Sequence, residues 1–150
     1  MKGIEKKISL NIGSVRITEK FFLENGRYNY SEENRNKTKE WIKENLEKLE
    51  KFKNESFILV GVAGTTTTQV SVREKMEVYD SEKIHLSSLT TKEINDNLEL
   101  FIKNINNNKN VKGLDAKRRD VIIGGTIILK EILEYLKKDT LIVSENDNLM

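Results

Sequence analysis

The residues best suited to chemistry lie in a glycine- and threonine-rich stretch, Gly61 to Thr68 (GVAGTTTT), which directly follows an apolar run. Gly61 and Gly64 would let the backbone approach a ligand closely, and the hydroxyls of Thr65 and Thr66 would face the same point. If a helix begins at the threonines, its unpaired N–H groups and its dipole favour an anion there. The stretch therefore predicts a phosphate-binding turn. The alternative is a tight turn whose threonines only cap the helix.

A second candidate is the basic segment from Lys112 to Asp120 (KGLDAKRRD). Guanidinium groups form paired hydrogen bonds with phosphate oxygens, and near a helix N-terminus they add to the attraction that the dipole exerts on an anion. We expect Arg118 to contact phosphate. The alternative is a surface arginine that pairs with Asp115 or Asp120.

No residue of the chain is predicted to be catalytic or to bind a metal. The chain has a single histidine, His85, and histidine as a residue type can act as a general base. However, no nucleophile pattern accompanies it, which favours a capping or packing role. Mg²⁺ prefers one or two carboxylates together with phosphates and waters, and no carboxylate here is placed convincingly for that. Because the chain has one histidine and no cysteine, a zinc site of several imidazoles and disulfide bonds are both excluded.

Apolar spacing predicts the elements that would position these residues. Alternating or continuous apolar runs predict strands, here with a bend at Gly13 and a buried central strand before the threonines. Apolar residues at helical spacing, with Ser31 as an N-cap and a Thr90–Glu93 capping box, predict helices. The predicted strands cover residues 7–17, 57–62 and 141–143. The predicted helices cover residues 31–52, the threonines to 74, 90–105 and 116–138.

The first half of the last helix is apolar nearly all round, so it is expected to be buried. Within it, Gly124 and Gly125 each cost roughly 1 kcal/mol relative to alanine. Something other than helix stability should therefore favour them. We expect a close approach between helices, either as plain packing or as part of a movable joint.

The element order predicts one α/β domain over residues 1–150, with helices packed on a mixed sheet. Charged residues make up 33% of the chain, but the formal net charge is only +2. This balance gives no reason to expect a nucleic acid or a membrane surface as a partner. The lack of cysteine, of a signal-like start and of a long apolar run points to the cytoplasm.

Several segments, in order, are similar to the exopolyphosphatase / guanosine pentaphosphate phosphohydrolase (Ppx/GppA) family. They are NIGSVRITEKF, GVAGTTTT, YDSEKIHLSSLT, GLDAKRRDVIIGGTIIL and LIVSEND. The chain departs from the family pattern at Ala116, where proline is usual, and at Leu86, where glycine is common; neither change touches Arg118. The resemblance implies a ribonuclease-H-like lobe of the actin-like ATPase superfamily, namely part of the second lobe, incomplete at its N-terminus.

The family resemblance also implies a function. Family members have two lobes around a cleft that binds phosphate chains and Mg²⁺, and the family's DIGGGSTE turn and first lobe are absent here. The parent enzyme would cleave phosphoanhydride bonds of polyphosphate or guanosine pentaphosphate. This chain would supply one wall of the cleft through Gly61, Gly64, Thr65, Thr66 and Arg118.

The resemblance further places the glycine pair Gly124 and Gly125 in a helix near the hinge between the lobes. The missing strands would leave an open sheet edge, through which a homodimer or a strand exchange is expected. The chain alone is expected to be inactive and to bind no metal. Two alternatives are a non-catalytic module that binds a phosphorylated ligand or supports assembly, and a fragment of another actin-like kinase, which the GLDAKRRDVIIGG segment fits less well.

Overall fold

The computed structural model describes residues 13–53, 58–61 and 63–145. Its α-helices are α1 (Ser14–Phe21), α2 (Glu32–Asn45), α3 (Ala63–Arg73), α4 (Ser81–Ile84), α5 (Thr91–Asn106) and α6 (Ile122–Tyr135). Its 3₁₀ helices are η1 (Leu46–Phe52) and η2 (Ala116–Arg118). Its strands are β1 (Leu23–Glu24), β2 (Arg27–Tyr28), β3 (Val60–Gly61), β4 (Ser88–Thr90) and β5 (Thr140–Val143).

Strands β3, β5 and β4 form a mixed sheet in that order. The β3–β5 pair is parallel, with Val60 opposite Ile142, and the β4–β5 pair is antiparallel, with Leu89 opposite Leu141. The sheet and the helices packed on it confirm the predicted α/β fold class. They also confirm an inner strand at residues 141–143, because β5 is the middle strand.

The prediction of a buried central strand at residues 57–62 is wrong for its described part. Strand β3 is short and lies at one edge of the described sheet. Ile58 is 78% exposed and Val60 is 41% exposed. Phe57 and Val62 lie outside the described residues. An apolar run indicates a strand, but it does not say whether both faces of that strand are covered.

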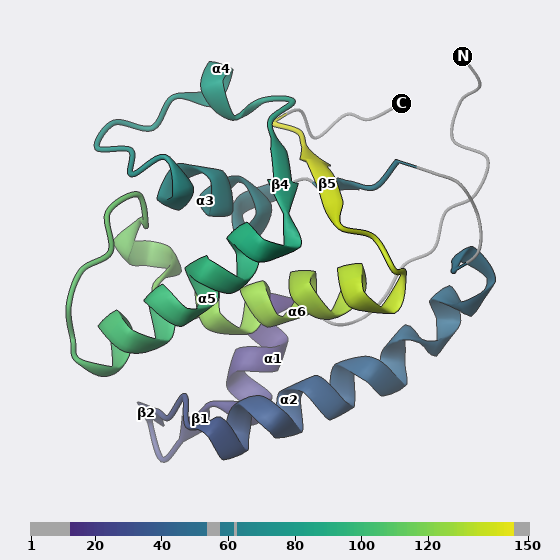
Figure 1. The fold of residues 1–150 in the computed structure, drawn as a ribbon. Coiled ribbons are helices and arrows are strands. Elements are labelled where there is room, and N and C mark those ends of the chain that lie inside the picture. The colour runs from purple at the N-terminus through teal and green to yellow at the C-terminus, as the bar shows by residue number, and fades with distance from the viewer. Residues whose placement is uncertain (1–12, 54–57, 62, 146–150) are drawn as a thin grey trace.

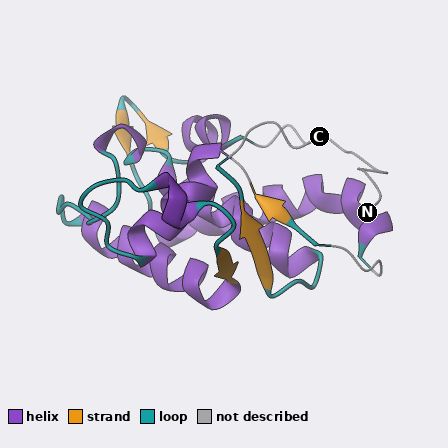
Figure 2. Ribbon diagram, turned by 90° about the horizontal axis from the view of Figure 1, so that it is seen from above, coloured by secondary structure: helices purple, strands orange, loops and turns teal. Residues whose placement is uncertain are grey.

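Helix α6 lies at the centre of the molecule and contacts α1, α2, α3 and α5. Figure 1 shows α6 crossing the middle of the view, with α2 below it and the sheet above. Ile122, Ile123 and Ile127 of α6 are at most 1% exposed, which confirms that the first half of this helix is buried. In the perpendicular view of Figure 2, the three-stranded sheet and the β1–β2 hairpin lie apart, with helices between them.

Helix α1 replaces the second half of the strand predicted over residues 7–17. Residues 7–12 lie outside the described residues, but the chain turns helical directly after Gly13, which serves as the N-cap. Ile17 and Phe22 are fully buried on the side that meets α6, whereas Val15 is 57% exposed. The apolar residues at every second position predicted a strand through residue 17. After Gly13, however, the chain is helical, and Val15 and Ile17 lie on different sides of the helix.

The β1–β2 hairpin was not predicted, although the sequence carries a signal for it. Asn25 and Gly26 both have positive φ, 51° and 76°, as a two-residue hairpin turn of the asparagine–glycine type requires. The signal is the Asn–Gly pair between short apolar and aromatic runs.

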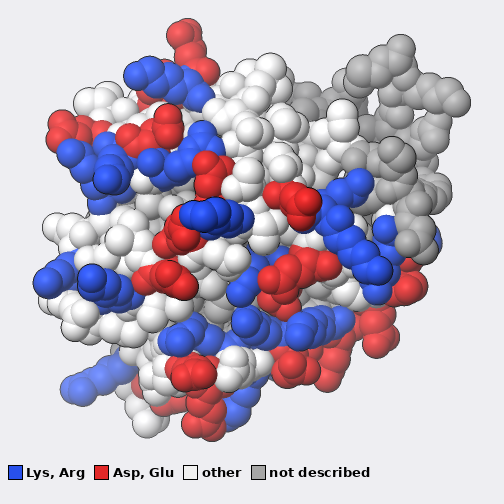
Figure 3. Space-filling view, viewed as in Figure 1, with Lys and Arg blue, Asp and Glu red and all other residues white. Residues whose placement is uncertain are grey.

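The helices predicted from capping signals are confirmed. The Ser31 hydroxyl accepts a hydrogen bond from the Asn34 N–H at 3.2 Å, and helical structure continues through η1 to Phe52. Thr90 and Glu93 form the capping box that starts α5. On the outer face of α2, pairs such as Lys37–Glu33 (3.3 Å) mix both signs of charge, as Figure 3 also shows for this side of the molecule. None of the described helices is long and apolar enough to cross a membrane.

Candidate anion site at the first turns of α1 and α3

The threonines after Gly64 are helical and do not form a turn before the helix. Helix α3 already begins at Ala63, so Thr65 to Thr68 fill its first turns. Thr66, Thr67 and Thr68 are 3%, 6% and 5% exposed. Threonine is a poor helix former, and packing outweighs that preference here. The prediction of a threonine turn is therefore corrected to a helix start.

Gly61 and Thr66 make a packing contact. A Cβ added at Gly61 would lie 2.5 Å from Thr66 Cγ2 and 3.2 Å from Leu141 Cδ1. The Thr66 side chain therefore faces β3 and β5 and not the solvent. These two predicted phosphate-binding residues therefore pack against each other, and the Thr66 side chain is buried.

Gly64 and Arg118 are brought together from distant parts of the chain. A Cβ added at Gly64 would overlap the Cζ, Nη1 and Nη2 atoms of Arg118, so the guanidinium group lies against the glycine on the first turn of α3. Asp115 caps η2 by accepting from the Lys117 N–H at 2.9 Å, and this short helix carries Arg118 to its position. Arg118 is exposed and has no ion pair within the described ranges. The expected alternative of pairing with Asp115 or Asp120 is not found.

Ser14 and Thr65 both pack against Gly125. A Cβ added at Gly125 would lie 2.8 Å from both Cγ2 and Oγ1 of Thr65 and 3.2 Å from Ser14 Cβ. Ser14 is the first residue of α1, so the first turns of α1 and α3 are neighbours. Sequence reasoning did not single out Ser14. The available signal was the small pair Gly13–Ser14, where the helix begins.

Gly124 faces α1 in the same part of α6. A Cβ there would lie 3.0 Å from Thr18 Oγ1 and 3.2 Å from Ile17 Cγ2. The close helix approach expected at the glycine pair is confirmed, with both glycines packed against helices of this chain. A role for Gly124 and Gly125 between two lobes stays a prediction.

We use the term "α1–α3 cradle" for Ser14, Gly64, Thr65, Arg118 and Gly125. The first N–H groups of a helix have no partner within that helix, and α1 and α3 both begin at the cradle. Hydroxyl, amide and guanidinium groups all donate hydrogen bonds, so the cradle is suited to an anion. Its residues include no carboxylate and do not fit Mg²⁺. Elsewhere in the described residues, no group of three or more His, Cys, Asp or Glu residues could hold a metal ion.

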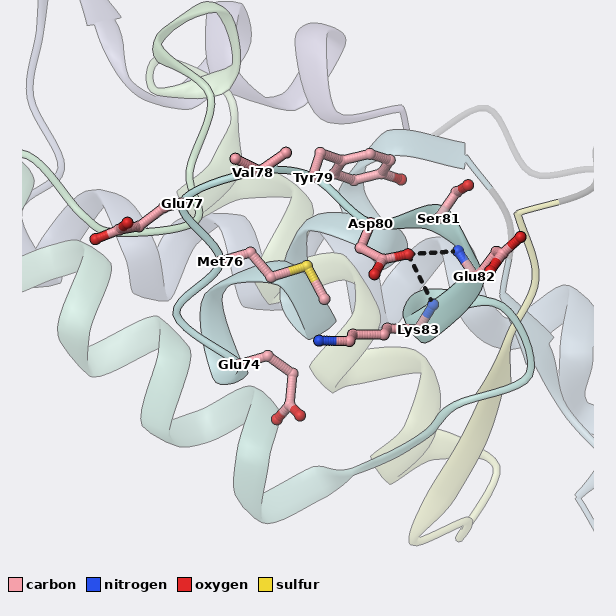
Figure 4. Close-up of a pocket in the computed structure, with 9 residues that line it drawn as sticks. All are labelled: Glu74, Met76, Glu77, Val78, Tyr79, Asp80, Ser81, Glu82 and Lys83. Carbon is pink, nitrogen blue, oxygen red and sulfur yellow. Dashed lines mark hydrogen bonds between the residues drawn. The ribbon is translucent and has the colours of Figure 1, made fainter.

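One open pocket of the described structure has the wrong charge for phosphate. It has a volume of about 650 Å³ and lies along residues 74–83, between α3 and α4 (Figure 4). Glu74, Glu77, Asp80 and Glu82 line it, against Lys83 as the one lining cation. Asp80 accepts hydrogen bonds from the backbone N–H groups of Glu82 and Lys83. The carboxylates would repel an anion, so this pocket does not compete with the α1–α3 cradle for phosphate.

His85 has a structural contact. Its Nδ1 accepts a hydrogen bond from the Glu145 N–H at 3.1 Å, just after β5. This confirms the expected capping or packing role. The acceptor requires an unprotonated Nδ1, and His85 is not part of the cradle.

The family of the chain follows from comparison with known proteins. The model of the Ppx/GppA phosphatase family matches residues 1–146. The chain belongs to this family. A bifunctional 3-dehydroquinate synthase/phosphatase from Fusobacterium nucleatum is 79% identical over 150 residues, and exopolyphosphatase 2 from Mycobacterium tuberculosis is 35% identical over 98 residues. The PPX-GPPA enzyme of Aquifex aeolicus superposes with a TM-score of 0.80 at 31% identity.

The chain spans only part of these relatives. It covers 22% of the Fusobacterium protein and 30% of the Mycobacterium protein. It covers 46% of the Aquifex chain, while 94% of this chain is matched there. The chain thus corresponds to one part of these longer relatives.

Proposed function

We propose that the parent protein is a phosphohydrolase that cleaves phosphoanhydride bonds of inorganic polyphosphate or guanosine pentaphosphate. This chain would supply one wall of the cleft through the α1–α3 cradle. The observation that supports this is the Arg118 guanidinium, which has no ion-pair partner among the described residues and lies on Gly64 at the first turn of α3. The phosphatase half of the Fusobacterium relative's name and the exopolyphosphatase name of the Mycobacterium relative agree with it.

The cradle would act by binding and charge stabilisation. When water attacks phosphorus, negative charge spreads over the oxygens of the transferred group, and fixed donors that face those oxygens lower the barrier. Arg118 would hold one phosphate through paired hydrogen bonds. The hydroxyls of Ser14 and Thr65 and the N–H groups of α1 and α3 would hold the neighbouring oxygens.

Neither the water-activating group nor the metal is assigned to this chain. Mg²⁺ would neutralise phosphate charge in the parent enzyme. However, the cradle offers donors where the ion needs oxygen ligands, so we propose that other parts of the parent enzyme hold it. Because the chain is assigned neither the metal nor the water-activating group, we expect the isolated chain to bind polyphosphate weakly and not to hydrolyse it. We propose the cytoplasm as the location, because the chain has no cysteine.

Calorimetric titration of the chain with tripolyphosphate tests this function. Arg118→Gln should raise the Kd about tenfold, as expected for the loss of a charge-assisted pair of bonds worth about 1.5 kcal/mol or more. Arg119→Gln is the matched control, because it removes the same charge next to Arg118 and leaves the cradle intact. Equal effects of the two substitutions would show a general attraction of charge and would argue against the cradle. Phosphate release by the isolated chain would contradict the proposal that other parts of the parent enzyme are needed for hydrolysis.

A further inference from the structure

A buried polar cluster joins α3, α5 and α6 behind the α1–α3 cradle. Gln69 and Thr126 are fully buried and Asn97 is 5% exposed. Gln69 Nε2 donates a hydrogen bond to Thr126 Oγ1 at 2.9 Å. Asn97 Nδ2 donates to Gln69 Oε1 at 2.9 Å and to the Gln69 backbone carbonyl at 3.0 Å. Thr126 Oγ1 in turn donates to the Ile122 carbonyl at 2.6 Å.

The cluster lies next to the contacts that form the cradle. Gln69 follows Thr65 by about one turn of α3, and Thr126 directly follows Gly125 in α6. The pair that is hydrogen-bonded in the core is thus adjacent to the pair that meets at the cradle. A slide or rotation of α3 along α6 would break the Gln69–Thr126 bond and displace Thr65 from Gly125 at the same time.

The hydrogen bonds of the cluster are better suited to fixing the position of α3 on α6 than to increasing the stability of the fold. Apolar contacts are not directional, so an apolar core would tolerate small displacements of α3 along α6. Hydrogen bonds depend on distance and angle, and a buried polar group that loses its partner is unfavourable. Removing one partner leaves the other unpaired and costs stability, whereas replacing both by apolar groups of similar shape is often nearly neutral. What such a replacement would remove is the fixed register between the helices.

We propose that Gln69 is a positioning residue which, through Thr126 and Asn97, sets the first turn of α3 against α6 and α1 and so shapes the anion cradle. The inference rests on the proposed function of the cradle but concerns residues that do not touch the ligand. The hydrogen bond between Gln69 and Thr126 is the part that can be removed with little change in shape.

The test compares Thr126→Val, which removes the hydroxyl at constant shape, with Thr126→Ser, which keeps it. Gln69→Met is a second variant that removes the amide from the other side. Ile94→Val is the control: it removes a methylene from the fully buried side chain of Ile94 on α5 and leaves the cluster intact. For each variant we would measure the unfolding midpoint, the Kd for tripolyphosphate, and the NMR amide shifts of Thr65 and Gly125 in the free chain.

If the inference is correct, Thr126→Val and Gln69→Met raise the Kd about fivefold. This is the change in affinity that corresponds to the net free energy of one ordinary hydrogen bond. Both variants also displace the Thr65 and Gly125 amide shifts, whereas Thr126→Ser behaves as wild type. Ile94→Val loses comparable stability and changes neither the Kd nor these shifts. Wild-type Kd and shifts in folded Thr126→Val and Gln69→Met would overturn the proposal, as would an equal loss of affinity in Ile94→Val.

The two proposals fail in different ways. If tripolyphosphate affinity does not depend on Arg118, the proposed function of the cradle fails. The amide shifts need no ligand, so they still decide whether Gln69 positions the first turn of α3. If affinity depends on Arg118 but not on the cluster, only the positioning role fails.

Discussion

At the scale of single residues, the contact between Gly64 and Arg118 allows stability and binding to be separated. Gly64→Ala should raise helix stability, by up to about 1 kcal/mol, because alanine is the better helix former. The added methyl would overlap the guanidinium, and the long Arg118 side chain can move away into solvent. We therefore expect an unchanged or higher unfolding midpoint together with tripolyphosphate binding weakened about fivefold or more.

Thermal unfolding and calorimetry of the same sample check this expectation. Arg118→Gln serves as the reference for complete loss of the contact. A Gly64→Ala chain that binds as tightly as wild type would show that the guanidinium does not act from its observed place.

Glu131 makes the folding stability of the chain depend on pH. It lies on α6 and is 3% exposed, and burial, followed by the charge of Glu134, raises its pKa. A raised pKa in the folded state means that folding favours the protonated form. Stability is therefore highest below the pKa of the unfolded carboxyl and is lost as the pH rises through the folded pKa.

We expect Glu131→Gln to raise the unfolding midpoint at pH 7 and to change it little at pH 4, because the glutamine stays neutral at both. Denaturant unfolding at the two pH values measures this difference. Glu99→Gln, at an exposed position of α5, is the control and should change the midpoint only slightly at both pH values. An equal gain from Glu131→Gln at both pH values would point to packing and not to charge.

At the scale of elements, the glycine pair of α6 sets how closely α1 can pack. Gly124→Ala would place a methyl 3.0 Å from Thr18 Oγ1, which is held by its bond to the Ser14 carbonyl at 2.6 Å. Thr18 and Ile17, the two neighbours on α1, are buried. We therefore expect a net loss of about 1–2 kcal/mol in the free energy of unfolding, despite the better helix propensity of alanine. Denaturant unfolding measures the loss. Glu134→Ala, on the outer side of the same helix, should be close to neutral, and a stabilised Gly124→Ala would show that α1 can shift.

The helices were predictable because their signals are local. Ser31 and the Thr90–Glu93 pair define starts through bonds to nearby N–H groups, and the apolar half of α6 indicates its burial without any tertiary information. Helix α1 was missed for the opposite reason: Val15 and Ile17 extend an apolar alternation across Gly13, and only contact with α6 favours the helix. The hairpin at Asn25–Gly26 was predictable from its turn residues but was overlooked.

The candidate site was predictable only in part. Arg118, Gly64 and Thr65 could be named because each residue type suits phosphate. Their meeting depends on how η2 and α3 pack, which no local pattern encodes. Burial turned Thr66 inward against Gly61, and Ser14 joined the site because Ser14 and Thr65 both pack on Gly125.

At the scale of the whole molecule, the edge of the sheet is the expected place for self-association. Within the described residues, β3 pairs with β5 on one side only, and Ile58 and Val60 are exposed. Such an edge can pair with another strand. We expect a concentration-dependent homodimer in sedimentation velocity, and Val60→Lys should weaken it about tenfold.

Val78→Lys is the matched control for this prediction, since Val78 is 81% exposed and lies far along the chain from β3, in the loop after α3. If both lysine variants weaken the dimer equally, the contact is not at the sheet edge. A chain that stays monomeric at high concentration would rule out this interface.

The central place of α6 has a consequence for synthesis. Helices α1, α2, α3 and α5 all pack on α6, yet α6 comes after all of them in the chain. While the ribosome is still translating the earlier helices, α1 can pack on α2, but side chains such as Ile17 and Ile42 still lack the surface that α6 provides. The nascent polypeptide must therefore keep much of its apolar surface exposed until residue 135 has left the exit tunnel, which makes it a candidate client for chaperones that bind unfolded chains.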